Sequence, residues 1–251
     1  MAQQTAGNID DVLEEILDYQ VDGIVLASVA MSSMLAERCD AAGIPVVLFN
    51  RAQQEDRFST VTSDNFAGGK ALAKFLVAGG HRRIGYIAGW EGASTQRDRE
   101  AGFCAGLAEH GHKLFARGVG DFRTETAANA ARAMFSASEF PDAVFVANDH
   151  MAFAVIEELR GNLGLRVPED VSVVGYDDVQ LSRWSSFDLT TVRQPSGEMV
   201  AETVAALMAQ IEDGETEPRR VKIDGPLVVR RSARRPTDWK TNWKGCDDER
   251  L

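Results

Sequence analysis

Short runs of Val, Ile and other apolar residues alternate along this chain with longer segments in which apolar residues recur every three or four positions. The short runs cover residues 23–27, 45–49, 84–88, 143–147 and 171–175. Each is apolar throughout, as a parallel strand covered by helices on both faces should be. The alternation therefore predicts βαβ units and an α/β fold built on mostly parallel sheets.

The segments between these runs have the spacing of amphipathic helices. Four apolar stripes are expected to face the core: Leu72, Phe75 and Leu76; Phe103, Cys104, Leu107 and Ala108; Met151, Val155 and Leu159; and Val200, Val204, Leu207 and Ile211. Asp64, Thr124 and Asn148 or Asp149 stand where helices should begin, and their side chains are good N-caps.

Length and composition limit the class of protein. A chain of 251 residues suits one large α/β domain or two lobes, and the interleaving of elements favours two lobes. No segment approaches the roughly 18 apolar residues of a membrane span. The N-terminus lacks a basic start followed by an apolar run, so we expect a cytoplasmic protein. Three scattered cysteines without a C-x-x-C pair disfavour a disulfide framework or a zinc site.

The formal net charge of −11 disfavours DNA binding by this chain alone, because its long-range field repels a polyanion. The concentrated basic cluster lies near the C-terminus, where we expect a solvated tail. It consists of Arg230, Arg231, Arg234 and Arg235.

Enzyme signatures are missing from the sequence. There is no G-x-S-x-G or H-E-x-x-H motif, and the Gly68-Gly69-Lys70 step lacks the rest of a Walker phosphate loop. We expect the four histidines, His81, His110, His112 and His150, to lie on the surface. The sequence therefore predicts a protein that is not an enzyme and uses no cofactor or metal.

Polar residues follow the predicted strands, which is where ligands bind in open α/β sheets. Asp177 and Asp178 end one strand, and paired carboxylates could carry out acid/base chemistry or bind a hard cation. No further ligands stand at metal spacing. We therefore favour the other interpretation, in which a carboxylate at a strand end accepts hydrogen bonds from the hydroxyls of a sugar or other polyol.

Seven stretches of the chain, in their order and spacing, resemble the LacI/GalR family of bacterial transcription regulators, and the resemblance runs from about residue 10 to about residue 236. They are VDGIVLAS (21–28), GIPVVLFNR (43–51), SDNFAGGKALAKFLVAGGHRRIGYIAG (63–89), RDREAGF (97–103), VFVANDHMAFAVIEEL (144–159), VPEDVSVVGYDD (167–178) and LTTVRQP (189–195).

This resemblance implies a periplasmic-binding-protein-like fold of two α/β lobes that close over a small effector. The N-terminal lobe would hold residues 1–89 and 195–222, and the C-terminal lobe 90–194 and 226–236, followed by a polar tail at 237–251. Crossovers between lobes would fall near Gly89, near 192–195 and near 222–226, where polar, Gly or Pro residues interrupt the periodic segments.

The resemblance also implies which residues bind the effector. Arg99 corresponds to the arginine that holds the ligand's polar edge, and Asp177 and Asn148 would bind its hydroxyls. Phe122 would stack on the ligand ring, and Asp64 would reach the ligand from the opposite lobe. Ser28 and Trp184 are weaker candidates. The alternatives are that Asp64 and Asn148 only cap helices and that Phe122 belongs to the core.

The chain departs from the family pattern at its start. Family members begin with a helix-turn-helix domain, a hinge helix and a strand, helix and strand; here the pattern starts only at the expected helix 8–20. We therefore expect an incomplete, weaker N-terminal lobe with an exposed sheet edge, and DNA contact only through the missing headpiece.

The resulting prediction is the effector-sensing and homodimerising part of a DNA-binding regulator, with a sugar or nucleoside-like effector. Two alternatives remain: a periplasmic sugar-binding protein of a transporter, and a Rossmann-like enzyme. For Arg99→Ala we expect loss of any effector response and a nearly unchanged melt of the unliganded protein.

Overall fold

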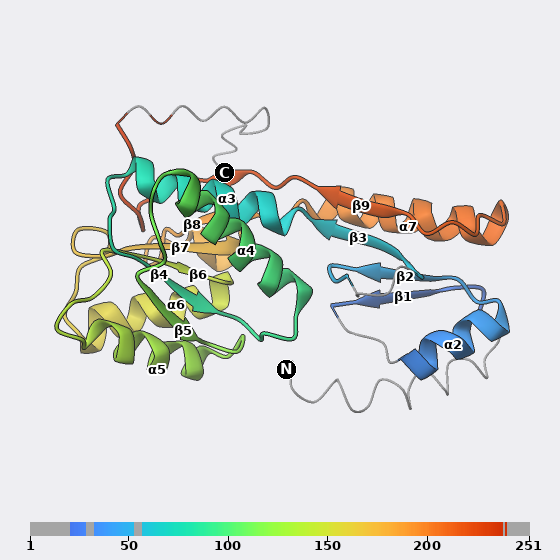
Figure 1. Cartoon of the computed structure of the whole chain (residues 1–251), viewed down its shortest axis with the longest axis horizontal. Helices are drawn as coiled ribbons and strands as arrows, with labels where there is room; N and C mark the ends of the chain where they lie inside the picture. The colour runs from blue at the N-terminus through green and yellow to red at the C-terminus, as the bar shows by residue number, and fades with distance from the viewer. Residues whose placement is uncertain (1–20, 29–32, 53–56, 238, 240–251) are drawn as a thin grey trace. The chain divides into compact units, whose positions relative to one another are not determined.

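The computed structural model describes residues 21–28, 33–52, 57–237 and 239, and divides them into two compact units (Figure 1). Unit 1 holds the described residues up to Asp64 together with Pro195–Ile223, and unit 2 holds Asn65–Gln194 and the described residues from Asp224 onward. Both units are α/β structures, which confirms the predicted fold class. The expected helix at 8–20 and most of the expected tail at 237–251 lie outside the described residues.

Unit 1 is built on a four-stranded parallel sheet in the order β1-β2-β3-β9. The strands are β1 (Ile24–Ala27), β2 (Val46–Phe49), β3 (Ser59–Ser63) and β9 (Arg220–Ile223). Leu26, Leu48 and Cys39 belong to one core cluster, which includes α2 (Ser33–Ala42). Val47 and Val61 pack with α7 (Ser196–Glu212) in another. Because successive strand residues point to opposite faces, the two helices cover opposite sides of the sheet.

Helix α7 packs on this sheet through a face other than the expected one. Met199, Thr203 and Ala206 are its buried residues, whereas Val200 and Val204 are 53% and 54% exposed. The helix carries apolar residues on two faces, so periodicity could not say which of them the sheet would cover. The expectation that the Val200 stripe faces the core is wrong for Val200 and Val204, whereas Leu207 of the same stripe packs against the unit 1 core.

Unit 2 is built on a six-stranded sheet in the order β10-β8-β7-β6-β4-β5, in which β10 alone runs antiparallel to its neighbour. The strands are β4 (Ile84–Ala88), β5 (Ala116–Val119), β6 (Ala143–Val146), β7 (Ser172–Asp177), β8 (Thr190–Arg193) and β10 (Leu227–Val228). The strands β4, β6 and β7 match predicted apolar runs. β5 and β8 contain Arg or Thr and gave no such run.

Helices cover both faces of this sheet (Figure 1). They are α3 (Asn65–Ala78), α4 (Ser94–Glu109), α5 (Thr124–Phe135) and α6 (Asp149–Glu157), with a π-helical turn at Glu158–Asn162 and the 3-10 helix η2 at Gln180–Arg183. Tyr86, Phe103 and Phe145 form an aromatic triangle in the core, with ring centroids 5.0 to 5.9 Å apart. The expected core stripes on α3, α4 and α6 are buried at Leu72, Phe75, Leu76, Phe103, Leu107, Met151, Val155 and Leu159. In the stripe on α4, however, Cys104 is only partly buried and Ala108 is exposed.

The close packing of α3 on α4 depends on glycines. A Cβ atom at Gly69 would lie 2.2 Å from the backbone oxygen of Arg99, and one at Gly102 would lie 2.0 Å from that of Phe66. Only residues without a side chain allow such an approach. These contacts fix α4, and therefore Arg99, against the start of α3.

The boundary between the units differs from the expected one. Strand β4 pairs with β5 and β6 in unit 2, and α3 packs on α4, so residues 65–89 belong to unit 2 and not with the N-terminal residues. The chain first passes between the units at Asp64–Asn65, not near Gly89. Loop-like residues after β4 suggested a crossover, but strand pairing decides the sheet to which β4 belongs.

Two residues that were expected at the surface, His81 and Arg230, are instead largely buried. His81 is 1% exposed, its Nδ1 lies 3.3 Å from Asp142 Oδ1, and burial lowers its pKa. The Arg230 side chain is 12% exposed and donates to Leu189 O and Asp178. Trp239, in the expected tail, packs edge-on against Phe75 with ring centroids 5.1 Å apart. No helix among the described residues has the length and apolar character needed to span a membrane.

Candidate functional site

Arg99 is the centre of a polar cluster at the carboxyl ends of the unit 2 strands. Its side chain is 3% exposed, and its guanidinium donates to Asn65 Oδ1 at 2.8 Å, Ala147 O at 2.6 Å and Asp177 Oδ1 at 3.1 Å. The guanidinium carbon also lies 3.7 Å from the ring centroid of Tyr176. Three hydrogen bonds and a stacked aromatic ring therefore fix the orientation of this cation.

Asp177 ends β7 and faces Arg99. Its Oδ1 accepts hydrogen bonds from Arg99 Nη2 at 3.1 Å and from Gln194 Nε2 at 2.7 Å. The side chain is 20% exposed. No hydrogen bond to Oδ2 is found within the described residues, so this oxygen can accept a hydroxyl hydrogen from a ligand.

Asn148 follows β6 and caps α6, with its Oδ1 accepting from Met151 N at 3.0 Å. It stands next to Ala147, whose carbonyl accepts from Arg99, so the structure brings Asn148 to the same strand ends as Arg99 and Asp177. Asn148 therefore does cap the helix. Because the cap uses only the side-chain oxygen, the side-chain amide nitrogen of Asn148 can still donate a hydrogen bond to another group.

Phe122 follows β5 with a positive φ of 55° and is half-buried against the unit 2 core. A Cβ atom at Gly89, directly after β4, would lie 2.2 Å from its ring. The aromatic ring therefore packs over the bare backbone at the end of β4. Core packing and ligand stacking both fit this position, because the ring is only partly buried.

A second network fixes the loop after β4 and the start of α4. Gln96 Oε1 accepts from Tyr86 Oη and from Gly89 N, both at 2.7 Å. Gln96 Nε2 donates to Glu100, and Arg117 bridges Glu100 and Glu91. Burial raises the pKa of the Tyr86 phenol, which keeps it a neutral donor.

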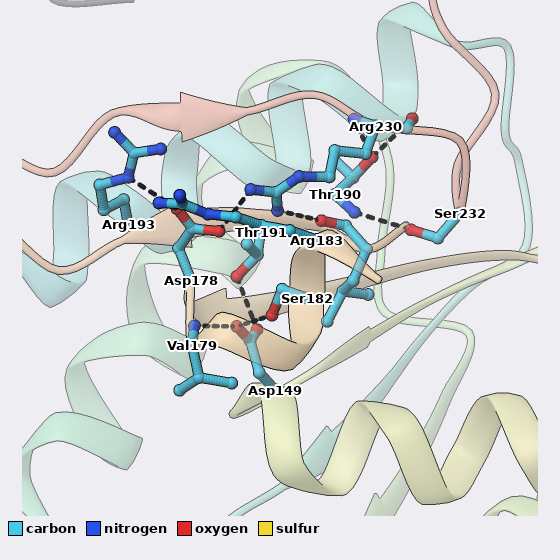
Figure 2. Close-up of polar contacts among 11 residues, drawn as sticks. Asp149, Asp178, Val179, Ser182, Arg183, Thr190, Thr191, Arg193, Arg230 and Ser232 are labelled. Atoms are coloured by element: carbon cyan, nitrogen blue, oxygen red, sulfur yellow. Dashed lines mark hydrogen bonds and ion pairs between the residues drawn. The ribbon is translucent and has the colours of Figure 1, made fainter. Parts of the chain in front are cut away.

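Beyond Asp177, two buried carboxylates organise the turn that follows β7 (Figure 2). Asp149 Oδ2 accepts from Val179 N at 3.1 Å and Ser182 Oγ at 2.6 Å, and its Oδ1 accepts from Thr191 Oγ1 at 2.6 Å. Asp178 accepts from Arg193 and Arg230, each at 2.6 Å.

The burial of Asp149 changes its acidity. Desolvation and the nearby charge of Asp177 raise the pKa of the Asp149 carboxyl to about 6, although its hydroxyl and backbone donors oppose the shift. The hydrogen bonds found for Asp149 come from neutral groups, so no ion pair offsets the cost of burying this charge.

Of the remaining predicted site residues, Ser28 and Asp64 belong to unit 1 and Trp184 belongs to unit 2. In unit 1, Ser28 follows β1 and Asp64 follows β3; Ser28 Oγ accepts from Asn50 Nδ2 at 3.3 Å, and Asp64 N donates to Ile223 O at 2.8 Å. Because β1, β2 and β3 are parallel neighbours, Ser28 and Asp64 both lie at the carboxyl ends of the strands of that sheet. Trp184 follows η2 and is 58% exposed, and its hydrogen bonds within the described residues are backbone bonds to Leu181, Phe187 and Asp188.

Sequence reasoning missed several residues that build the site. Tyr176, Gln194 and Asn65 all contact Arg99 or its partner Asp177. Tyr176 and Gln194 stand in the motifs GYDD and VRQP, so their neighbourhood was a signal, but nothing in the sequence paired them with Arg99. No cluster of three or more His, Cys, Asp or Glu that could hold a metal occurs in the residues described.

Comparison with known proteins places this geometry in context. Residues 73–233 match the family model of the periplasmic binding protein-like domain. The HTH-type transcriptional repressor PurR of Photobacterium profundum is 30% identical over 92% of this chain and 70% of its own length. The regulator CelR of Thermobifida fusca is 37% identical over 84% of this chain and 63% of its own.

Solved structures agree with these relatives. A complex of the transcriptional regulator CelR with cellobiose has a TM-score of 0.83 and 34% identity, covering 90% of this chain and 71% of that one. A LacI transcriptional regulator from a Rhodococcus species has a TM-score of 0.81 and 27% identity, covering 89% and 82% of the two chains. The chain thus spans about two thirds of the length of the curated relatives it matches.

Proposed function

Because this chain belongs to the LacI family of transcriptional regulators, as an effector-sensing domain, we propose that its effector is a sugar held by the Arg99 cluster of unit 2. The observation that carries the proposal is the Asp177 carboxylate. One of its oxygens is fixed by Arg99 and Gln194, which leaves the other as a preoriented hydroxyl acceptor.

The roles of the residues follow from their chemistry. Asp177 accepts a hydroxyl hydrogen, and Asn148 donates from an amide group whose oxygen is occupied by its helix cap. Phe122 offers an aromatic face to the apolar side of a sugar ring. Arg99 orients the Asp177 carboxylate through its ion pair, and its guanidinium has further N–H groups that can donate to the ligand.

This function is binding without covalent chemistry. Effector binding would favour one conformation of the domain over another, and in the intact regulator this would change operator binding. The chain itself carries a net charge of −11, which disfavours contact of this domain with the operator. Operator contact would therefore belong to a separate basic headpiece, and the regulator would act in the cytoplasm. We further propose that the regulator is a homodimer, which sedimentation of the protein will test. The relatives named above are regulators, which disfavours the transporter alternative.

A nucleoside-like molecule is the competing effector, since an arginine, a carboxylate and an aromatic face also suit a nucleobase. Calorimetric titration of the protein with cellobiose, D-glucose, D-ribose, hypoxanthine and guanine distinguishes the two classes. We expect binding of a sugar, and a preference for a purine base would refute the proposal.

Two variants locate the site. Asp177→Asn should weaken sugar binding by about 10-fold to 100-fold, because a hydrogen bond to a charged group contributes about 1.5–3 kcal/mol. Asp170→Asn is the matched control, since Asp170 pairs with Arg166 on an exposed segment of the same unit. Equal affinity of both variants would show that Asp177 does not bind the sugar.

A further inference from the structure

The turn after β7 has a strained backbone. Asp177 has a φ of 123° and Asp178 a φ of 55°, values that favour glycine, although neither residue is a glycine. Such conformations persist only where the surrounding contacts determine them. The strain lies at the residue whose carboxylate faces Arg99.

Asp149 supplies contacts to this turn from another element. It is the first residue of α6 and is fully buried. Its three hydrogen bonds reach Val179 in the turn, Ser182 in η2 and Thr191 in β8, as Figure 2 shows. A Cβ atom at Gly175 would lie 2.3 Å from Asp149 Oδ1, so the carboxylate also packs on the bare backbone of β7. One carboxylate therefore joins three segments around the turn.

Asp178 fixes the turn from its other side. Its buried carboxylate accepts from Arg193 in β8 and from Arg230 after β10. The backbone of Asp177 is thus followed directly by two anchored residues, Asp178 and Val179. Arg183 lies 3.9 Å from the same Asp178 oxygen as Arg193 and adds a weaker attraction.

Asp149 is unsuited to direct ligand contact, because its oxygens are buried and already accept three hydrogen bonds. Its burial without an ion pair is unfavourable for folding. Asp149 thus lowers the stability of the fold and cannot contact a ligand. Its role is therefore to fix the geometry of the segments to which it is hydrogen-bonded.

We propose that Asp149 is a positioning residue that holds the turn 177–182 in the one backbone conformation that directs the Asp177 carboxylate at Arg99 and Gln194. The proposal rests on the proposed function in one respect, namely that Asp177 binds the effector. Asp149 acts on the effector only through Asp177.

Hydrogen exchange of the full chain tests the positioning without any ligand. In Asp149→Asn we expect the amides of Val179 to Trp184 to exchange about tenfold faster than in the unmodified protein, while the core strands β4 and β6 are unchanged. Asp170→Asn, which removes an exposed carboxylate of the same unit, should leave these amides unchanged. A folded Asp149→Asn protein with unaltered exchange in the turn would overturn the proposal.

Thr191 provides a second, milder pair of variants in case Asp149→Asn does not fold. Thr191→Val removes the hydroxyl that donates to Asp149 Oδ1, and Thr191→Ser retains it. Exchange in the turn should rise in Thr191→Val and return to the original rate in Thr191→Ser. Equal rates in the two variants would contradict a positioning role, since only Thr191→Val removes the hydroxyl that donates to Asp149.

Titration with cellobiose separates this inference from the proposed function. If the unmodified protein binds cellobiose, Asp149→Asn should weaken binding about tenfold, and unchanged affinity would overturn the positioning role. If neither cellobiose nor another sugar binds, the proposed function fails, while the exchange rates still decide whether Asp149 holds the turn.

Discussion

Replacement of Arg99 by Ala should destabilise the unliganded protein strongly. The sequence alone suggested the opposite, because an arginine that binds an effector would be exposed before the effector arrives. In the structure its side chain is 3% exposed, and it donates to Asn65, Ala147 and Asp177. Removal takes one hydrogen bond each from a buried carbonyl, an amide oxygen and a carboxylate.

The magnitude follows from these contacts. Breaking a buried ion pair by removing one partner costs about 3–5 kcal/mol, because the remaining charge is left without compensation. Asp177 is 20% exposed and still accepts from Gln194, so water can recover part of this loss. We therefore expect a loss of about 3 kcal/mol, which lowers the melting temperature of a chain of this size by roughly 10 °C.

Calorimetric and circular-dichroism melts of the unliganded protein measure this effect. Arg99→Lys keeps the charge but loses the planar fork, so an intermediate loss is expected. The double variant Arg99→Ala/Asp177→Ala should lose less free energy of unfolding than the two single variants lose together, by about 1 kcal/mol or more, because the two side chains contact each other. A melting temperature of Arg99→Ala within about 2 °C of the original would refute the reasoning.

Three further predictions concern stability. Gly102→Ala should lower the free energy of unfolding by about 3 kcal/mol, because its Cβ would lie 2.0 Å from Phe66 O. Gly161→Ala, whose Cβ would have no atom within 4 Å, should be neutral or slightly stabilising in the same urea titration. Tyr86→Phe should cost about 1 kcal/mol in urea unfolding, because it removes the 2.7 Å bond to Gln96; no loss would mean that this bond contributes nothing net. The pKa of Asp149 is raised from 3.8 to about 6, beside Asp177, so the native state binds this proton more tightly than the unfolded state. Lowering the pH from 7 to 5 should therefore add about 1 kcal/mol of stability from this group. The lowered pKa of His81, beside Asp142 and Arg234, acts in the opposite direction. The contribution of Asp149 is therefore measured as the difference in pH-dependent stability between the unmodified protein and Asp149→Asn. An identical pH dependence of the two proteins would contradict the prediction.

Local patterns in the sequence were sufficient for the fold class and for most of the buried strands. β2, β4, β6 and β7 are apolar runs covered on both faces, and such runs are visible without any knowledge of their partners. β5 and β9 lie at sheet edges and carry exposed charged residues, so their composition gave no comparable signal. Their pairing with β4 and β3 is a tertiary contact.

The site shows the same division between local and distant information. Asn148 was recognisable as a helix cap because a cap acts within three residues. Arg99 and Asp177 were found through the resemblance of their motifs to a known family. Asp149 looked like another cap, and only the folded chain shows that its carboxylate bonds to residues 30 to 42 positions away.

The sequence by itself determined that this chain forms parallel α/β units and that its polar residues of interest follow strands. Those properties depend on the period of a single strand or helix. The tertiary structure decided which face of α7 is covered, that β4 belongs to unit 2, and that Arg99 is bound by residues 34, 48 and 78 positions away. Burial, hydrogen bonding and pKa values depend on such distant partners, and no local pattern encodes them.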